Sequence, residues 1–388
     1  MLSLLWMTFR VVARFCLSSL TSRRMLSIGR LGHKCLLCVR GTSAADFLQG
    51  LVTNDIFSIA RPNCFMYSLI LNTKGRILAD TFVYNLQNES VDDVGYLLEV
   101  DKRYANQLYA YFSKYNLRKK VALSLEDNLS VWVAMASASS EPLIDFKAWL
   151  PVTQPDTGES ALNRNLFFYA PDPRGVPGWS GRVLIRSGIQ ANDIFTAASP
   201  SPLSVNSYNM ARWRLGLPEG PEELISGETL PLEANADLSG GVDFSKGCYV
   251  GQELTARTRF TGVVRRRFAP VQLEPLDSSV PEELVSGCHF LNAPIYMCSV
   301  ANQAQRSPKV KPSGWLRAFC SNYPTSPEAS FCGIALLRLT DATSSTGARL
   351  VAELPMDSSN EAHKLLVTPY APSWWPDEVA VRLPRLKH

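Results

Sequence analysis

Residues 242–259, VDFSKGCYVGQELTARTR, bring small, charged and nucleophilic side chains together more densely than any other part of the chain. Ser245 is placed to cap a helix that begins close to Cys248. A thiol at a helix N-terminus beside a lysine, here Lys246, is expected to ionise readily. The stretch therefore predicts that Cys248 is the reactive or ligating thiol of the chain. A tight strand-to-helix turn around a buried cysteine is the alternative that the pattern leaves open.

The residues that follow Lys246 are of the kinds that a small-ligand site uses. Gly247 and Gly251 lack a Cβ atom, so a backbone or a ligand can approach closely there. Gln252 and Glu253 are polar side chains that can hydrogen-bond a heterocycle or orient the thiol. We interpret the stretch as a candidate site.

The sequence on either side predicts a mixed body followed by a β-barrel or sandwich. A chain of 388 residues is long enough for two or three domains. Apolar periodicity predicts strands at 34–39, 64–71, 77–84, 96–100, 121–125 and 131–135, and helices after Ser43, near Asp101 and at 208–215. After Arg265, short strands alternate with clusters of proline, serine and glycine, as in all-β domains.

Charge is unevenly distributed along the chain. The 39 lysines and arginines against 35 acidic residues give a formal net charge of +4. Seven of the basic residues lie in residues 1–45, which contain no acid, so the other 32 leave residues 46–388 at −3. A body of this charge lacks the basic surface of a nucleic-acid-binding protein. The run Arg265, Arg266 and Arg267 does not replace it, because alternation on a strand sends the middle arginine to the opposite face.

Residues 1–32 have the composition of a mitochondrial transit peptide. They are rich in arginine, serine and leucine, and Arg10 and Arg14 lie one helical turn apart. These two arginines interrupt the apolar run that a secretory signal needs, and no stretch of the chain offers the roughly 20 apolar residues of a membrane span. We expect import into the mitochondrial matrix, with cleavage after Arg24 and before the first strand. A basic N-terminus without a targeting signal is the alternative.

Nine cysteines in such a compartment are expected to be reduced thiols. Cys35 and Cys38 form a C-x-x-C pair, but residues three apart on a strand point to opposite faces, so we expect them in the core rather than on a shared metal ion. Cys288, His289 and Cys298 lack the further ligands of a tetrahedral metal site.

The octapeptide KGCYVGQE at 246–253 resembles the signature of the folate-binding branch of the aminomethyltransferase-like superfamily, whose members are related to the glycine-cleavage T-protein. Within that branch the chain resembles the mitochondrial iron-sulfur cluster assembly factors, also described as transferases. The resemblance runs from about residue 34 to about residue 376. Its further segments are FLQGLVTNDI at 47–56, LNTKGRILAD at 71–80, RWRLGLPEG at 212–220, LPLEAN at 230–235, ELTARTRFTGVVRRR at 253–267 and SWWP at 373–376.

This resemblance implies an α+β fold in which two N-terminal α+β lobes, residues 33–264, and a C-terminal β-barrel, residues 265–388, surround a central folate-type pocket. It implies late maturation of 4Fe-4S proteins of the aconitase and lipoate-synthase types, together with A-type iron-sulfur carrier proteins. Neither nucleic acid nor a membrane span belongs to this role. The contacts to tetrahydrofolate would come from Lys246, Gly247, Tyr249, Gly251, Gln252, Glu253 and Arg257.

Two functions follow from these residues. Iron-sulfur clusters normally take four soft protein ligands, so our first hypothesis is that Cys248 shares a transient cluster with the thiols of a partner, without catalysis by this chain. The alternative is a folate-dependent one-carbon transferase with Asp80 as the acid–base group and Gln252, Glu253 and Arg257 near the ligand. The T-protein has an Asp-Asp pair where this chain has Ala79 followed by Asp80, so the paired carboxylates of that chemistry are incomplete.

Overall fold

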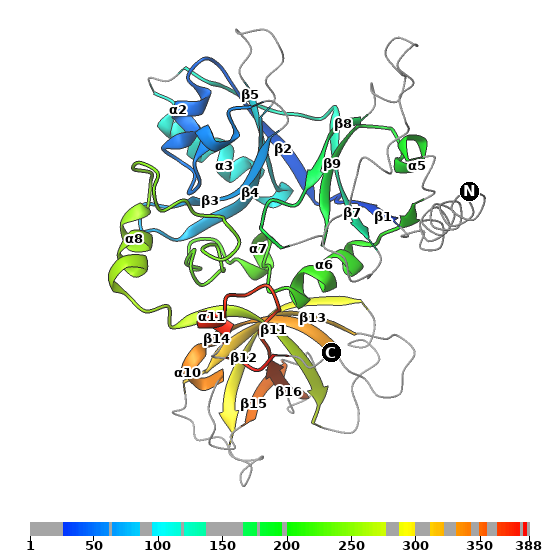
Figure 1. Cartoon of the computed structure of the whole chain (residues 1–388), viewed down its shortest axis with the longest axis vertical. Coiled ribbons are helices and arrows are strands. Elements are labelled where there is room, and N and C mark those ends of the chain that lie inside the picture. Colours follow the sequence, from blue (N-terminus) through cyan, green and yellow to red (C-terminus); the bar gives the residue numbers. More distant parts are fainter. Residues whose placement is uncertain are drawn as a thin grey trace, which may run out of the picture.

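The computed structural model consists of two five-stranded sheets and a closed six-stranded barrel (Figure 1). It describes residues 26–61, 64–85, 95–117, 120–136, 166–176, 179–195, 200–276, 287–298, 311–321, 331–342, 349–354, 363–380 and 383–385. In Figure 1 the two sheets lie side by side above the barrel, and helices α6 (Val205–Arg214) and α7 (Gly220–Glu223) lie at the junction. The predicted α+β class with a C-terminal barrel is confirmed.

The first sheet is antiparallel and has the order β3-β4-β5-β2-β6. Its strands are β2 (Lys34–Arg40), β3 (Phe65–Leu71), β4 (Ile77–Asn85), β5 (Gly95–Asp101) and β6 (Ala122–Leu125). Both faces of this sheet are covered, so alternate residues of a strand enter two different cores. In β2, Leu37 and Val39 pack under helices, whereas Leu36 and Cys38 face the second sheet. The covering helices are α2 (Ala44–Gln49), η1 (Ile56–Ile59), η2 (Lys102–Tyr104) and α3 (Ala105–Tyr115).

The second sheet has the order β10-β1-β7-β9-β8 and packs its outer face on the short helix α5 (Ala191–Ile194). Its strands are β1 (Leu26–Arg30), β7 (Leu129–Ala136), β8 (Leu166–Pro171), β9 (Gly181–Arg186) and β10 (Ser201–Pro202). Strand β1 pairs with β7 and β10 and buries Leu26 and Ile28. Residues 26–30 therefore belong to the folded body, although they fall inside the predicted transit peptide 1–32. The sequence did not indicate this strand, because five residues next to a basic segment are too short for a clear apolar alternation. Residues 1–25 of the predicted transit peptide lie outside the described residues.

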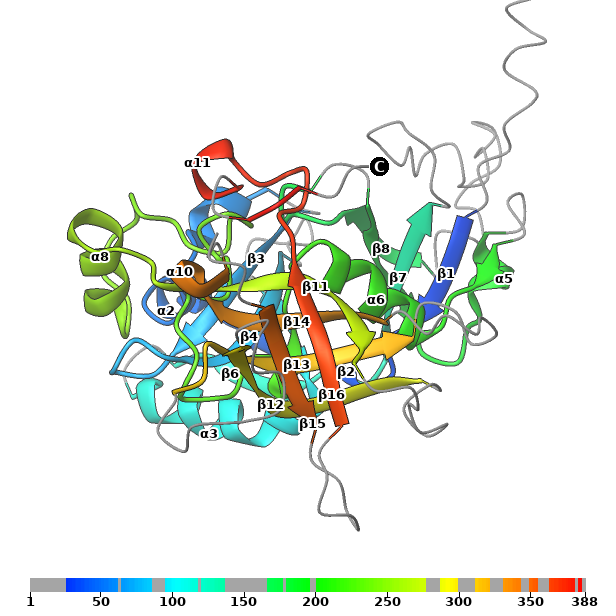
Figure 2. The same ribbon diagram turned by 90° about the horizontal axis from the view of Figure 1, so that it is seen from below.

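The barrel has the order β11-β14-β13-β12-β15-β16 and closes because β16 also pairs with β11. Its strands are β11 (Arg266–Pro275), β12 (Cys288–Cys298), β13 (Gly314–Ser321), β14 (Phe331–Arg338), β15 (Arg349–Leu354) and β16 (His363–Pro369). Figure 2, seen from the barrel side, shows these strands in front of the two sheets, with α10 (Leu339–Ala342) and α11 (Asp377–Ala380) near one end. Inward residues such as Val271, Leu316 and Ala335 fill the barrel, and outward ones such as Phe268 and Leu336 join the core shared with both sheets.

Helix α8 (Gln252–Thr261) follows a long irregular segment and stands at the edge of the molecule beside the first sheet (Figure 1). The segment between α7 and α8 contains no strand and carries the KGCYVGQE motif. The motif is therefore positioned by hydrogen bonds to neighbouring segments.

Candidate functional site

The loop before α8 holds Cys248 in an exposed position. Asp243 Oδ1 accepts hydrogen bonds from the Ser245 N–H at 2.7 Å, the Ser245 hydroxyl at 2.6 Å and the Lys246 N–H at 3.2 Å. These bonds, the serine hydroxyl's first, lower the pKa of Asp243. Ser245 thus completes a turn with Asp243 and caps no helix. The prediction of a helix starting near Cys248 is wrong, since α8 starts at Gln252.

Lys246 fixes this loop to the segment that follows α2. Its Nζ donates to the carbonyls of Gln49, Val52 and Asn54, each at 2.8 Å, and lies 5.0 Å from the centre of the Tyr249 ring. Burial lowers the pKa of Lys246 to about 8. Each N–H of the ammonium thus has a carbonyl partner in the protein itself, which leaves none for a ligand.

Gly251 packs the motif against the β3–β4 hairpin. It has φ of +82°, and a Cβ atom there would lie 2.3 Å from the Asn72 carbonyl oxygen. Gly75 of the hairpin faces it, and its own Cβ would lie 2.8 Å from the Gly251 oxygen. The space beside Gly251 is therefore filled by protein backbone, which explains the glycine without a ligand. Around Gly247 there is open space, since an added Cβ would meet no atom within 4 Å.

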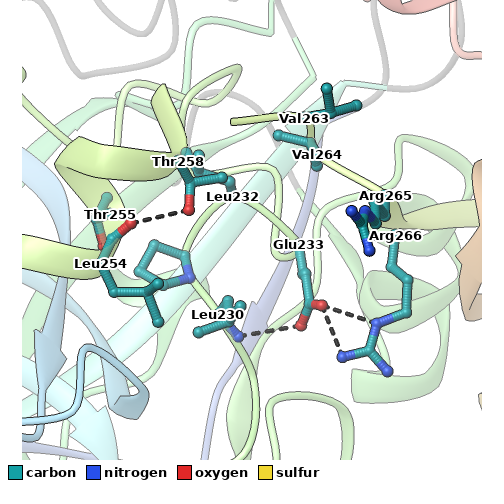
Figure 3. A pocket seen from close by; sticks show the side chains of 11 residues that line it. Leu230, Leu232, Glu233, Leu254, Thr255, Thr258, Val263, Val264, Arg265 and Arg266 are labelled. Carbon is teal, nitrogen blue, oxygen red and sulfur yellow. Dashed lines mark hydrogen bonds and ion pairs between the residues drawn. The ribbon is translucent and has the colours of Figure 1, made fainter. Parts of the chain in front are cut away.

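The other predicted folate contacts do not converge on one cavity. Tyr249 is buried, Gln252 is partly exposed, and Glu253 and Arg257 are exposed on α8. A cavity of 260 Å³ lies next to them, between α8 and residues 230–233 (Figure 3). None of the site residues predicted from the sequence lines it.

The walls of this cavity are mostly aliphatic. Glu233 stands at one side, where it accepts from the Leu230 N–H at 3.2 Å and from Arg266 Nε at 2.8 Å (Figure 3). The hydroxyl of Thr255 is buried in the opposite wall and has no hydrogen-bond partner in the described part of the chain. Arg265 is exposed at the mouth.

A buried set of charged side chains and one tyrosine, here called the central ionic cluster, occupies the junction of the two sheets and α6. Its members are Lys34, Asp80, Glu99, Asp172, Arg174, Arg182, Tyr208, Arg212, Glu219 and Glu223. Glu219 is the hub: its Oε1 accepts from Tyr208 at 2.6 Å, Arg174 at 2.7 Å and Arg182 at 3.4 Å. Burial alone would raise the pKa of Glu219, but Arg174, Lys34 and Arg182 outweigh it and hold that pKa well below its usual range.

Asp80 enters this cluster from β4. Its Oδ1 accepts from the Gly220 N–H at 3.0 Å, and its Oδ2 lies 3.6 Å from Lys34 Nζ, which is also 3.5 Å from Glu219 Oε2. Burial disfavours the charged form of Lys34, yet these two carboxylates raise its pKa above the usual value. Within the described chain, Asp80 Oδ2 and Glu219 Oε2 have no hydrogen-bond donor. Both buried oxygens are thus ion-paired with Lys34 and still have capacity to accept a hydrogen bond.

Arginines and aromatic rings surround these two carboxylates. The Arg174 guanidinium lies 5.0 Å from the Phe82 ring centre and 5.1 Å from that of Trp179. Arg212 holds α6 to α7 through both carboxylate oxygens of Glu223, at 2.8 and 2.5 Å. The sequence analysis missed this cluster apart from Asp80, because its members are scattered from residue 34 to 223. The available signal was charge inside otherwise apolar strands, as in ILADTFVYN and GYLLEVD.

The two groups of residues differ in their fit to tetrahydrofolate. In the motif around Lys246, the ammonium of Lys246 and the space beside Gly251 are taken up by the protein itself. Gly247 has open space around it, and Gln252, Glu253 and Arg257 are at least partly exposed. In the central ionic cluster, Asp80 Oδ2 and Glu219 Oε2 accept no hydrogen bond from the described residues and are the acceptors that a pterin N–H would meet, but both are buried and already ion-paired with Lys34 Nζ, at 3.6 and 3.5 Å.

The structure also bears on the metal, basic-surface and membrane features considered from the sequence. Across the described ranges, no three histidine, cysteine, aspartate or glutamate side chains are arranged to hold a metal ion. Cys35 and Cys38 enter different cores, which confirms that they face apart. Arg266 and Arg267 are paired with Glu233 and with an aspartate, so the arginine run forms no free basic surface. Among the helices that the structure describes, none has the length and apolarity to cross a bilayer.

No family model matches the chain, but individual known proteins do. A Neurospora crassa protein described as "Iron-sulfur cluster assembly factor IBA57 homolog, mitochondrial" is 31% identical over 405 residues, covering 93% of this chain and 81% of that protein. Proteins of the same description from Coccidioides immitis and Pyricularia oryzae are 36% and 37% identical, covering 66% and 63% of this chain and 59% and 56% of their own lengths.

A solved structure shares the fold. The crystal structure of the glycine cleavage system aminomethyltransferase T from Bartonella henselae superposes with a TM-score of 0.59 at 14% identity, covering 94% of this chain and 89% of that one. The likeness extends over both sheets and the barrel.

Proposed function

The chain belongs to the family of iron-sulfur cluster assembly factors formed by the IBA57 homologues, and from this premise we propose that it promotes the maturation of 4Fe-4S proteins in the mitochondrial matrix. Its proposed partners are A-type iron-sulfur carrier proteins, and its proposed clients are enzymes of the aconitase and lipoate-synthase types. In this role the chain presents and positions a cluster and catalyses no turnover. The residue that meets the cluster is Cys248.

The exposed thiol of Cys248 on an anchored loop is the observation that carries this proposal. Three hydrogen bonds from Lys246 and the turn around Asp243 hold the loop, so the thiol is presented at a fixed place. One thiolate cannot satisfy a cluster that normally takes four protein ligands. Since no metal-binding group of three side chains exists among the described residues, the other ligands come from the partner.

The experiment is cluster reconstitution on the purified full chain mixed with an A-type carrier, without oxygen. Visible absorbance and iron content of the isolated complex are compared for wild type, Cys248→Ser and Cys298→Ser. Cys298 is a matched control because it is a partly exposed thiol on the barrel strand β12. We expect the Cys248 variant alone to lose the cluster of the complex. Equal occupancy in all three proteins would contradict the proposal.

A folate-dependent one-carbon transferase is the second candidate, favoured by Asp80 Oδ2 and Glu219 Oε2, which are paired with Lys34 and accept no hydrogen bond from the described residues. These two carboxylates would hold the pterin, Asp80 would also serve as the acid–base group, and Lys34 would stabilise its charge. Tetrahydrofolate, when bound, would carry the one-carbon unit. Calorimetry with tetrahydrofolate, followed by formaldehyde release from an aminomethyl donor, separates the two functions. Turnover that Asp80→Asn abolishes would favour the transferase, and binding without turnover would favour assembly.

A further inference from the structure

Three cysteines lie side by side across three adjacent barrel strands. Cys288 on β12 is directly opposite Cys320 on β13, and Cys320 is directly opposite Cys332 on β14. Directly opposite residues of antiparallel strands point to the same face and have Cβ atoms about 4.5–5.5 Å apart. The three thiols therefore form one row, here called the cysteine row, with Cys320 in the middle.

The cysteine row faces outward from the barrel, toward α6. Cys320 belongs to the core shared with the two sheets, whereas its neighbour Phe319 belongs to the barrel interior. The thiol of Cys288 donates to the Asn206 carbonyl of α6 at 3.8 Å. Cys288 is partly exposed, while Cys320 and Cys332 are buried. A small reagent from solvent therefore reaches the row at Cys288.

A shared metal ion does not account for this row. Its outer thiols, on strands two apart, are separated by twice the strand spacing, about 9–10 Å, which exceeds the span of one ion's ligands. In the part of the chain that the structure describes, no three ligand side chains converge on a metal position. Neighbouring members are instead within the range for a disulfide, whose Cα atoms are about 4.4–6.8 Å apart, as in antiparallel pairs.

We propose that Cys288 and Cys320 form a reversible disulfide that staples β12 to β13, with a small peptide disulfide such as oxidised glutathione as the oxidant. Cys320 faces both other cysteines, but only Cys288 is open to the oxidant, so the link joins these two. The proposal is independent of cluster assembly at Cys248.

The reaction is two thiol–disulfide exchanges. In the first, the sulfur of Cys288 attacks one sulfur of oxidised glutathione, the S–S bond breaks, and the departing glutathione thiolate takes the Cys288 proton. In the second, the sulfur of Cys320 attacks Cys288 Sγ of the mixed disulfide and expels the second glutathione, which takes the Cys320 proton. Two protein thiols are oxidised to one disulfide, and one glutathione disulfide is reduced to two thiols.

The third cysteine is the poorer partner for the second exchange. Burial raises the pKa of Cys332 to about 11, so its thiolate forms less readily than that of an ordinary cysteine. Cys332 also lies opposite Cys320 and not opposite Cys288, so Cys320 is the thiol beside Cys288 Sγ of the mixed disulfide.

The test equilibrates the full chain with graded ratios of reduced to oxidised glutathione, blocks free thiols under denaturing conditions, and maps disulfide-linked peptides by mass spectrometry. We expect a Cys288–Cys320 link and the loss of two alkylatable thiols, reversed by dithiothreitol. Cys332→Ser should retain the link and Cys320→Ser should lose it. Cys35 and Cys38, which face apart, are the internal control and should remain unlinked.

Two results would overturn the proposal. One is full, separate alkylation of Cys288 and Cys320 at the most oxidising ratio. The other is a link between Cys320 and Cys332 in place of the expected link, or a Cys288–Cys320 link that forms only when Cys332 is intact.

Discussion

Replacing Lys246 with methionine should lower the free energy of unfolding by about 2–4 kcal/mol at neutral pH. The ammonium donates to three backbone carbonyls at 2.8 Å, and these bonds join the motif to the segment after α2. Methionine has a similar length and retains the apolar contact with the Tyr249 ring, but it donates nothing. The substitution therefore isolates the hydrogen bonds from the packing.

The magnitude follows from the burial of the three carbonyls. A hydrogen bond to a charged group contributes about 1.5–3 kcal/mol, which would suggest roughly 4–9 kcal/mol for three. The bonds to Gln49 and Asn54 are only part-buried, so water can replace the lost donor there at little cost. The bond to Val52 is buried, and an unsatisfied carbonyl there costs about 1–3 kcal/mol. Adding a modest loss for the two part-buried bonds gives a total of about 2–4 kcal/mol.

Equilibrium urea unfolding at pH 7, followed by circular dichroism, measures this cost. Lys74→Met is the matched control, since Lys74 is exposed in the hairpin between β3 and β4 and should change stability by less than about 0.5 kcal/mol. If the two variants unfold at the same urea concentration, the hydrogen bonds of Lys246 do not hold the motif, and the reasoning is refuted.

Five further substitutions test other parts of the structure. Gly251→Ala should lower the free energy of unfolding by about 2 kcal/mol or more, because Gly251 has a positive φ and lies against neighbouring backbone. Gly247→Ala, which places a methyl group in open space, should leave stability nearly unchanged. Equal melting temperatures of the two variants in a thermal-shift assay would count against the packing described for Gly251. Burial, with the charge of the adjacent lysine, lowers the pKa of His33 from 6.5 to about 4. Between pH 6.5 and pH 4 the unfolded chain therefore takes up a proton at His33 that the folded protein does not, so the free energy of unfolding is highest above pH 6.5 and falls toward pH 4. His33→Gln should reduce this fall, measured by urea unfolding at several pH values. Glu219→Gln should destabilise the protein by about 3–5 kcal/mol, since it leaves buried cations without their counter-charge, and unchanged urea stability would speak against its role as hub. Thr255→Val should leave the melting temperature unchanged or raise it, because the buried hydroxyl has no partner among the described residues to offset its desolvation, and a clear drop would reveal a partner.

Local patterns in the sequence predict much of the fold. Alternation in KCLLCVR and in the strands around the 72–76 turn indicated β2, β3 and β4, and the hairpin glycine has the positive φ that such a turn needs. The change to short, punctuated strands after Arg265 indicated the barrel. These features depend on neighbouring residues alone, so they are visible without the tertiary structure.

Features that depend on distant residues were not predictable in this way. Strand β1 exists because β7 and β10 pair with it on both sides. Helix α8 begins at Gln252 because Gly251 packs against Asn72, about 180 residues earlier in the chain, and the sequence near Cys248 does not reveal that contact. The central ionic cluster likewise forms only when both sheets and α6 meet.

The site residues inferred from the sequence have different surroundings in the structure. Cys248 is exposed, as a ligating thiol must be, although it does not lie at a helix terminus. Asp80 is buried in the central ionic cluster, away from solvent. Lys246 and Gly251, which the resemblance implies as folate contacts, make contacts within the protein that hold the loop in place. The motif alone shows which residue types are present and does not show which groups their side chains meet.

Client activity tests the central claim most directly. Mitochondria are isolated from cells that express wild type, Cys248→Ser or Cys298→Ser in place of the native chain, and the activity of an aconitase-type 4Fe-4S enzyme is measured relative to the amount of its polypeptide. The account predicts that Cys248→Ser alone lowers this specific activity while the variant itself accumulates normally. Full client activity with Cys248→Ser would contradict the claim that this thiol meets the cluster.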